Sequence, residues 1–223
     1  MLKLQSTLIV FFISLIITAP SLAQVHFAAS FDLNTSLFSF KHGDRMIGDV
    51  EDGTGVGTHL KMYAPFEGDY RLGGNILYSH DDHPGNFYNF QFYQPSVGPI
   101  IGMEAPRYSL WAFYNWNMGW VEGDAKKSSV CGDACSGGNF KADLKGGILG
   151  LSAGYRVKPD MELHLFFTRA DLSMKDVPYR QATFLDDSKE WSDARATIDY
   201  SYTQVGVMFS WLLTNPNLVR DRG

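Results

Sequence analysis

The clearest pattern in the chain is a strict alternation of side-chain character between residues 55 and 64. One parity carries glycine, polar or charged groups, among them His59 and Lys61. The other parity suits an apolar medium and consists of Val56, Thr58, Leu60, Met62 and Ala64. A period of two is what an extended strand with two unlike faces produces. The segment is therefore predicted to be a β-strand with one face against an apolar medium.

Seven further segments are rich in aromatic and β-branched residues and are separated by turn signals. The predicted strands cover residues 27–40, 55–65, 70–79, 87–103, 108–120, 140–157, 161–172 and 196–213. Their connections alternate long and short, and the residues 173–195 form the last long polar loop. Short turns on one rim and long loops on the other are typical of membrane barrels. The pattern predicts an all-β fold, an eight-stranded antiparallel up-and-down transmembrane β-barrel.

The facing of the fifth, sixth and eighth predicted strands stays open. Between residues 200 and 204, both parities carry side chains that suit lipid. A β-bulge, which places one extra residue in a strand, would reconcile the two parities there.

Residues 1–23 differ from the rest and are predicted to be a cleaved signal peptide. A short polar start with Lys3 precedes an apolar run over 8–18, and Ser21-Leu22-Ala23 forms a small-x-small cleavage site. The apolar run is too short for a membrane anchor, which needs about 20 residues as a helix. Cleavage leaves about 200 residues, a length that suits one barrel domain over residues 24–213.

No later segment offers eighteen consecutive apolar residues, so the exported chain is either soluble or crosses a membrane as strands. Strands in lipid require a closed sheet, because an open edge would leave unpaired N–H and C=O groups in hydrocarbon. Each predicted strand reaches the roughly 9–11 residues that a tilted strand needs to cross.

The last predicted strand carries the most specific motif. In Gln204-Val205-Gly206-Val207-Met208-Phe209-Ser210-Trp211, the positions Gln204, Gly206, Phe209 and Trp211 resemble the carboxy-terminal assembly signal of outer-membrane barrels. The resemblance implies recognition by the barrel assembly machinery during biogenesis. Family members usually end at the final aromatic residue, whereas this chain continues with a polar tail, residues 214–223.

Across the exported part, the layout is similar to that of the small eight-stranded outer-membrane proteins of the OmpA, OmpX and OmpW type, with no signature of one subfamily. This resemblance implies a place in the cell outer membrane of a Gram-negative bacterium, with outer-membrane lipid and lipopolysaccharide as neighbours. The long loops would then face outward and could contact an extracellular ligand. The resemblance is architectural and does not determine function.

The net charge and the two cysteines bear on which partners and covalent links the chain can have. The formal net charge is −5, which gives no reason to expect nucleic acid as a partner. Cys131 and Cys135 are the chain's two cysteines. In an oxidising compartment they are predicted to form a loop-closing disulfide rather than half of a metal site.

Polar residues on the inward parity are the candidates for chemistry. Eight strands leave an interior just wide enough for side chains to fill, so we interpret these residues as lumen packing. The candidates are His59, Lys61, Arg71, Asn75, Glu162 and His164. Glu162 and His164 share a face and could be catalytic, but without a nucleophile motif no catalytic residue is predicted. The run from His80 to His83 is interpreted as a solvated loop and not as a metal site, and no cofactor is expected.

The first functional hypothesis is a structural or surface-interaction barrel with a filled or narrow lumen. The alternatives are a small passive channel, a lipid A-modifying enzyme, and a secreted soluble barrel of lipocalin type. The last of these should not carry the carboxy-terminal assembly signal.

Overall fold

The computed structural model describes residues 25–40, 51–85, 88–125, 139–185 and 188–213. The predicted signal peptide, the two cysteines of the predicted disulfide and the predicted polar tail lie outside these residues. The strands in the described part are β1 (His26–Phe40), β2 (Gly53–Pro65), β3 (Tyr70–His83), β4 (Tyr88–Glu104), β5 (Tyr108–Asn117), β6 (Trp120–Ala125), β7 (Phe140–Lys158), β8 (Met161–Leu185) and β9 (Ser188–Leu212). Within the same residues, no helix is long and apolar enough to cross a membrane.

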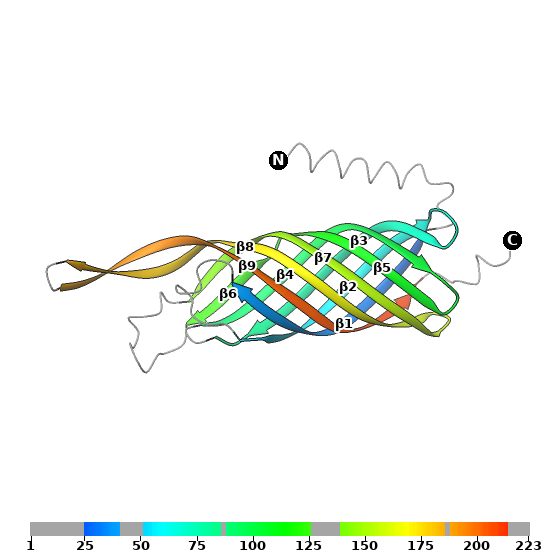
Figure 1. The fold of residues 1–223 in the computed structure, drawn as a ribbon, viewed down its shortest axis with the longest axis horizontal. Helices are drawn as coiled ribbons and strands as arrows, with labels where there is room; N and C mark the ends of the chain where they lie inside the picture. Colours follow the sequence, from blue (N-terminus) through cyan, green and yellow to red (C-terminus); the bar gives the residue numbers. More distant parts are fainter. Residues whose placement is uncertain (1–24, 41–50, 86–87, 126–138, 186–187, 214–223) are drawn as a thin grey trace.

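The strands form one antiparallel sheet that closes on itself (Figure 1). β1 pairs with β2 and β9, and the β3–β4 pairing completes the ring. β5 and β6 each pair with β4 on one side and β7 on the other, so together they form one strand of the wall. With β5 and β6 counted as one, each of the eight wall strands pairs with the strands that precede and follow it, and the predicted eight-stranded up-and-down barrel is confirmed. We call the rim of short turns the turn end and the opposite rim the loop end.

The fifth predicted strand was expected to be continuous over residues 108–120, but the wall breaks at Met118 and Gly119. Pro95 on the facing strand β4 has no N–H group, so it cannot donate to the ladder. Its carbonyl instead accepts from the Met118 N–H at 2.9 Å, and the Gly119 N–H donates to the side chain of Asn117 at 3.1 Å. The wall stays closed although the regular pairing stops.

The predicted long polar loop over residues 173–195 is wrong. β8 and β9 continue through it as a two-stranded hairpin that pairs from Val177 with Ala196 to Leu185 with Ser188 (Figure 1). The hairpin projects beyond the rest of the barrel. Polar sequence is compatible with a strand here because the segment lies beyond the apolar part of the wall, where no face has to meet lipid.

The bulge also lies elsewhere than expected. Pairing is regular along residues 200–204, and the register shift falls in β8 between Met174 and Val177, opposite residues 196–198. Asp176 takes up the extra residue with a φ of 58°, a conformation that Asp and Asn adopt more readily than most residues. Tyr200, Tyr202 and Gln204 consequently all point into the barrel.

The interpretation of residues 80–83 as a loop is also wrong, because β3 extends to His83. The four residues alternate across the wall like the rest of the strand. Asp81 and His83 are buried on the inner face, whereas Asp82 is exposed on the outer face.

The outer face of the barrel has two zones. From the turn end to about mid-height its side chains are apolar, over residues 56–64 of β2 and 205–213 of β9. Each run is about nine residues, the length with which a tilted strand crosses bilayer hydrocarbon. We call this zone the apolar band. Nearer the loop end the outer face becomes polar and charged, with Lys141, Asp143, Lys145, Arg169 and Asp171.

Aromatic pairs lie at both edges of the apolar band. Tyr108 and Tyr155 pack with ring centroids 5.5 Å apart at the turn end, and Tyr93 stacks on Trp120 at 5.1 Å toward the loop end. Lys141 lies 4.5 Å from the Trp120 ring centroid and 2.9 Å from Glu122, just outside the band. Such girdles favour a membrane–water boundary, where an amphipathic ring contacts both media.

Candidate functional site

The lumen is the candidate site, because most polar side chains of the described residues that are buried point into it. At the turn end, Glu104 accepts hydrogen bonds from the Tyr63 hydroxyl at 2.8 Å and from Arg71 Nε at 3.1 Å. Tyr63 packs edge-on against Trp111 with centroids 4.7 Å apart, and Lys61 Nζ lies 5.1 Å from the Trp111 centroid. Side chains from four strands thus occupy the barrel entrance.

The next layer is centred on the carboxylate of Glu162. Arg156 donates to Oε1 at 2.7 Å, while the Ser109 hydroxyl donates to Oε2 at 3.0 Å. His164 Nε2 lies 3.1 Å from the same Oε2. A buried carboxylate is costly unless it is paired and hydrogen-bonded, and both conditions hold here.

Asp32 and His59 form the middle layer. His59 Nε2 lies 3.0 Å from Asp32 Oδ2, and Asn34 donates to the other carboxylate oxygen at 2.9 Å. Both side chains are almost fully buried. This contact joins the neighbouring strands β1 and β2 on the inner face of the wall.

Asp81 is the hub of the layer above. Gln204 and Gln94 donate to its two oxygens at 2.8 and 3.0 Å, and Ser36 and Ser79 donate at 3.3 Å each. Because four donors from β1, β3, β4 and β9 converge on one carboxylate, this layer ties together both sides of the barrel. The Tyr202 hydroxyl donates to Gln94 and begins the transition to a different interior.

Toward the loop end the interior is apolar and aromatic. Phe92 lies 5.5 Å from Tyr200 between ring centroids, and Tyr88 packs edge-on against Phe140 at 5.2 Å. We call this cluster the apolar plug; its members are Tyr88, Phe90, Phe92, Val121, Phe140, Ala142, Leu144, Ile148, Ala170, Leu172, Met174, Val177, Ile198, Tyr200 and Tyr202. Each is at most 8 % exposed, so the plug fills the barrel at this level.

The hydrogen bonds around Glu162 differ from those of a hydrolase triad. Ser109, His164 and Glu162 are the residue types of a hydrolase triad, but the serine donates to the carboxylate and not to the imidazole. Ser109 and His164 are also at most 1 % exposed, so neither reaches the surface of the described structure. In the described residues, no group of three or more His, Cys, Asp or Glu side chains is arranged to hold a metal ion.

The structure places all six predicted polar candidates in the lumen. Lys61, Glu162 and His164 lie near the turn end, and Arg71 lies at the rim itself. His59 lies in the middle layer, and Asn75 contacts Asn115 at 3.5 Å across the barrel. They lie at successive levels of the lumen, and Glu162 and His164 are in hydrogen-bonding contact with each other.

Two central carboxylates, Asp32 and Asp81, were not among the predicted candidates. Asp32 could have been found, because Ser30, Asp32, Asn34 and Ser36 form a polar parity opposite Phe31 and Leu33. Asp81 was missed because its segment was interpreted as a loop.

The assembly-signal residues occupy both faces of β9. Gln204 and Gly206 face the lumen, while Phe209 and Trp211 face outward in the apolar band. The two aromatic residues are therefore part of the outer surface of the strand that closes the barrel against β1.

Comparison with known proteins supports the fold. No protein-family model matches the chain, and no curated protein matches it. Among solved structures, the chain is similar to Neisserial surface protein A, with a TM-score of 0.52, 10% identity, and coverage of 83% of this chain and 96% of that one. It is also similar to the outer membrane protease OmpT from Escherichia coli, with a TM-score of 0.51, 9% identity, and coverage of 84% and 97%. At these identities the likeness shows a common fold, that of outer-membrane β-barrels.

Proposed function

We propose that this protein is an integral outer-membrane barrel that does not conduct and that acts at the cell surface. The apolar band, its aromatic edges and the shared fold support insertion into the outer membrane. The assembly motif on β9 supports delivery there by the barrel assembly machinery after removal of residues 1–23. In this orientation the turn end faces the periplasm and the loop end faces outward, beside the lipopolysaccharide.

The observation that carries the proposal is the filled lumen. The polar layers around Glu162, Asp32 and Asp81 occupy the membrane-spanning part, and the apolar plug closes the outer part. An ion would have to pass buried, mutually hydrogen-bonded groups and then a hydrocarbon-like interior, where its desolvation is very costly. A barrel of eight strands has no spare diameter around these side chains.

The outward parts supply the surface for interaction. The β8–β9 hairpin continues beyond the other strands, and from residue 177 to residue 196 it pairs only with itself in the described structure. A rigid, membrane-anchored scaffold that holds such a projection is suited to contact with an extracellular ligand, as loops on a rigid frame commonly are.

Planar-bilayer recording of the refolded protein tests the sealed lumen. We expect no discrete conductance steps from the wild type. A variant that removes large plug side chains, Phe92→Ala with Tyr200→Ala, serves as the comparison, and Phe31→Ala with Leu33→Ala on the outer face is its matched control. Regular steps from the wild type would contradict the proposal and favour a passive channel.

The surface role is tested on whole cells with residues 178–195 replaced by a short turn. Expressing cells should lose attachment to protein-coated surfaces or to one another, while the barrel should still show the altered gel mobility of an unboiled, folded protein. Unchanged attachment in every assay, with the barrel folded and surface-exposed, would count against an interaction role for the hairpin.

A further inference from the structure

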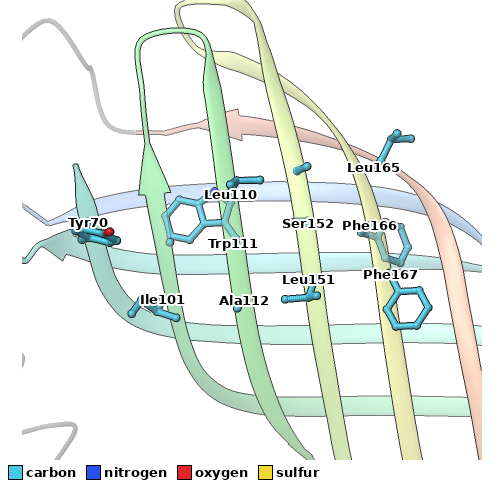
Figure 2. A pocket seen from close by; sticks show the side chains of 12 residues that line it. Tyr70, Ile101, Leu110, Trp111, Ala112, Leu151, Ser152, Leu165, Phe166 and Phe167 are labelled. Carbon is cyan, nitrogen blue, oxygen red and sulfur yellow. The ribbon is translucent and has the colours of Figure 1, made fainter.

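A concavity of about 580 Å³ lies on the outer wall, within the apolar band and close to the turn end (Figure 2). It extends from Tyr70 on β3 across β4, β5, β7 and β8, and its lining is almost entirely apolar. The other outward-facing residues that line it are Ile101, Leu110, Ala112, Leu151, Ala153, Leu165 and Phe167. The volume falls within the range of about 300–1,000 Å³ that small-ligand sites occupy.

Two small residues produce the depth of this groove. Ala112 is paired with Ile101 on one side and Leu151 on the other, so a methyl group lies between two branched side chains. Figure 2 shows these three residues on successive strands. One step nearer the turn end, Ala153 lies in the same way between Leu110 and Leu165. The two low points join into a groove that slants across the wall.

The turn end below the groove is cationic and aromatic. Arg107 is exposed in the turn between β4 and β5, and Lys158 is exposed at the end of β7, next to the turn that leads to β8; the Tyr108–Tyr155 pair lies just above them. A backbone hydrogen bond from Arg156 to the Arg107 carbonyl, 2.8 Å long, holds the two turns together. Asp160 is an exposed carboxylate between the same strands, and the exposed Asp69 precedes Tyr70 at the β3 edge of the groove.

The distances match a molecule with a charged head and an apolar tail. Arg107 precedes Leu110 by three residues and Ala112 by five, which is roughly 10 and 16 Å along an extended strand. A head group held at the turns would therefore place a hydrocarbon tail in the groove. Tyrosines at this depth suit the interface between the two parts.

We propose that this groove binds one acyl chain of an anionic phospholipid from the periplasmic leaflet, with the phosphate held by Arg107 and Lys158. The occupant follows from the position of the groove: the medium against the apolar band is lipid hydrocarbon, and the cations lie where lipid phosphates lie. A concave apolar surface beside basic residues distinguishes such a site from ordinary contact with surrounding lipid.

Native mass spectrometry of the refolded barrel tests this site, with phosphatidylglycerol and phosphatidylcholine of the same chain length as probes. The wild type should retain one phosphatidylglycerol in preference to phosphatidylcholine. Filling the groove with Ala112→Phe or, more mildly, Ala153→Leu should reduce that adduct several-fold. Ala29→Phe is the matched control, since Ala29 also faces outward in the apolar band but lies on β1, away from the groove. Altered gel mobility before boiling verifies that each variant is folded.

The role of the two cations in binding the lipid head group is tested with the double variant Arg107→Gln, Lys158→Gln. This variant should lose the preference for phosphatidylglycerol and keep the weaker phosphatidylcholine adduct. Lys145→Gln with Lys175→Gln removes the same charge at the other end of the wall and should change neither. Equal adducts in the wild type and both groove-filled variants would overturn the proposal. A wild-type dimer that the filled variants lose would also overturn it, because a second copy would then occupy the groove.

Discussion

The half of the barrel within the apolar band and the half beyond it are built from the same strands but with opposite faces. On β8 the inward parity runs through Glu162, His164, Phe166 and Thr168 and then consists of the apolar residues Ala170, Leu172 and Met174. The outward parity changes at the same level, from leucine and phenylalanine to charged residues. The sequence of the change is Phe167 outward, Thr168 inward, Arg169 outward, Ala170 inward, Asp171 outward and Leu172 inward.

The same inversion occurs on β9, β7 and β4. On β9 the outward Val205 and Val207 give way to Thr203 and Asp199, while inward Gln204 gives way to Tyr202. No register shift accompanies the change on β9, so the strand itself does not rotate. The inversion is therefore in the sequence pattern and not in the backbone.

The medium outside the wall explains the difference. Where the outer face meets hydrocarbon, apolar groups must face outward, and the lumen holds hydrogen-bonded polar layers among buried side chains such as Phe113 and Phe166. Where the outer face meets water, the usual hydrophobic effect applies and the apolar groups gather inside. The comparison teaches that this protein is a membrane barrel continued by a water-facing barrel with an ordinary apolar core.

The largest expected contrast uses one residue type in the two halves. Phe92→Ala removes a side chain that is 1 % exposed in the apolar plug, and should lower the free energy of unfolding by about 3–5 kcal/mol. Phe31→Ala removes an outward side chain from the apolar band, where lipid replaces it, and should cost about 0.5 kcal/mol. Urea unfolding in lipid vesicles, followed by tryptophan fluorescence, measures both. Equal losses of unfolding free energy in the two variants would mean that the apolar plug does not stabilise the barrel as a hydrophobic core does.

The second contrast concerns the polar interior of the band. Glu162→Ala leaves Arg156 and the other donors without their carboxylate, and should lower the free energy of unfolding by about 3 kcal/mol. Glu162→Gln keeps an acceptor and should cost clearly less. The same urea titration compares the two. A loss below about 1 kcal/mol for the alanine variant would show that water reaches this layer and solvates the arginine.

The barrel itself could be predicted because its determinants are local. The period of two in residues 55–64 and the alternation of connection lengths follow directly from the two-faced wall and the two unlike rims. The hairpin over residues 173–195 could not, because outside the lipid neither face must be apolar and the pattern disappears. The hairpin is held by the pairing of β8 with β9, which the local sequence pattern does not indicate.

The interior was predicted in part. Parity alone indicated that His59, Lys61 and Glu162 face the lumen, since their neighbours in the strand suit lipid. The sequence also shows the exchange of polar and apolar faces along β8, because the outward position changes from Phe167 to Arg169. Interpreting that exchange requires knowing where the lipid ends. The convergence of four donors on Asp81 could not be predicted, because it depends on the register between strands far apart in sequence.

A charge placed on the outer face sharpens the boundary between the halves. Leu33→Arg lies within the apolar band on β1 and should lower the free energy of unfolding in vesicles by about 2 kcal/mol. Thr197→Arg is also outward but lies beyond the band, and should leave it unchanged. In detergent-free urea titrations the two variants should separate clearly. If Thr197→Arg were the costlier change, the assignment of the two zones would be reversed.

The smallest expected effect concerns an exposed ion pair in the water-facing half, where the high dielectric constant of water weakens the attraction between charges. Arg169 lies on the outer face beyond the band, 3.8 Å from Asp171 and 2.9 Å from the Ser201 hydroxyl. Since both charged groups are substantially exposed, Arg169→Gln should cost about 0.5 kcal/mol or less. That cost should vanish in 1 M salt, where screening acts over about 3 Å. Arg156→Gln, beside the buried Glu162, should cost more and keep its cost in salt. Equal and salt-independent costs would mean that lipid reaches Arg169, and the apolar plug would then lie inside the membrane.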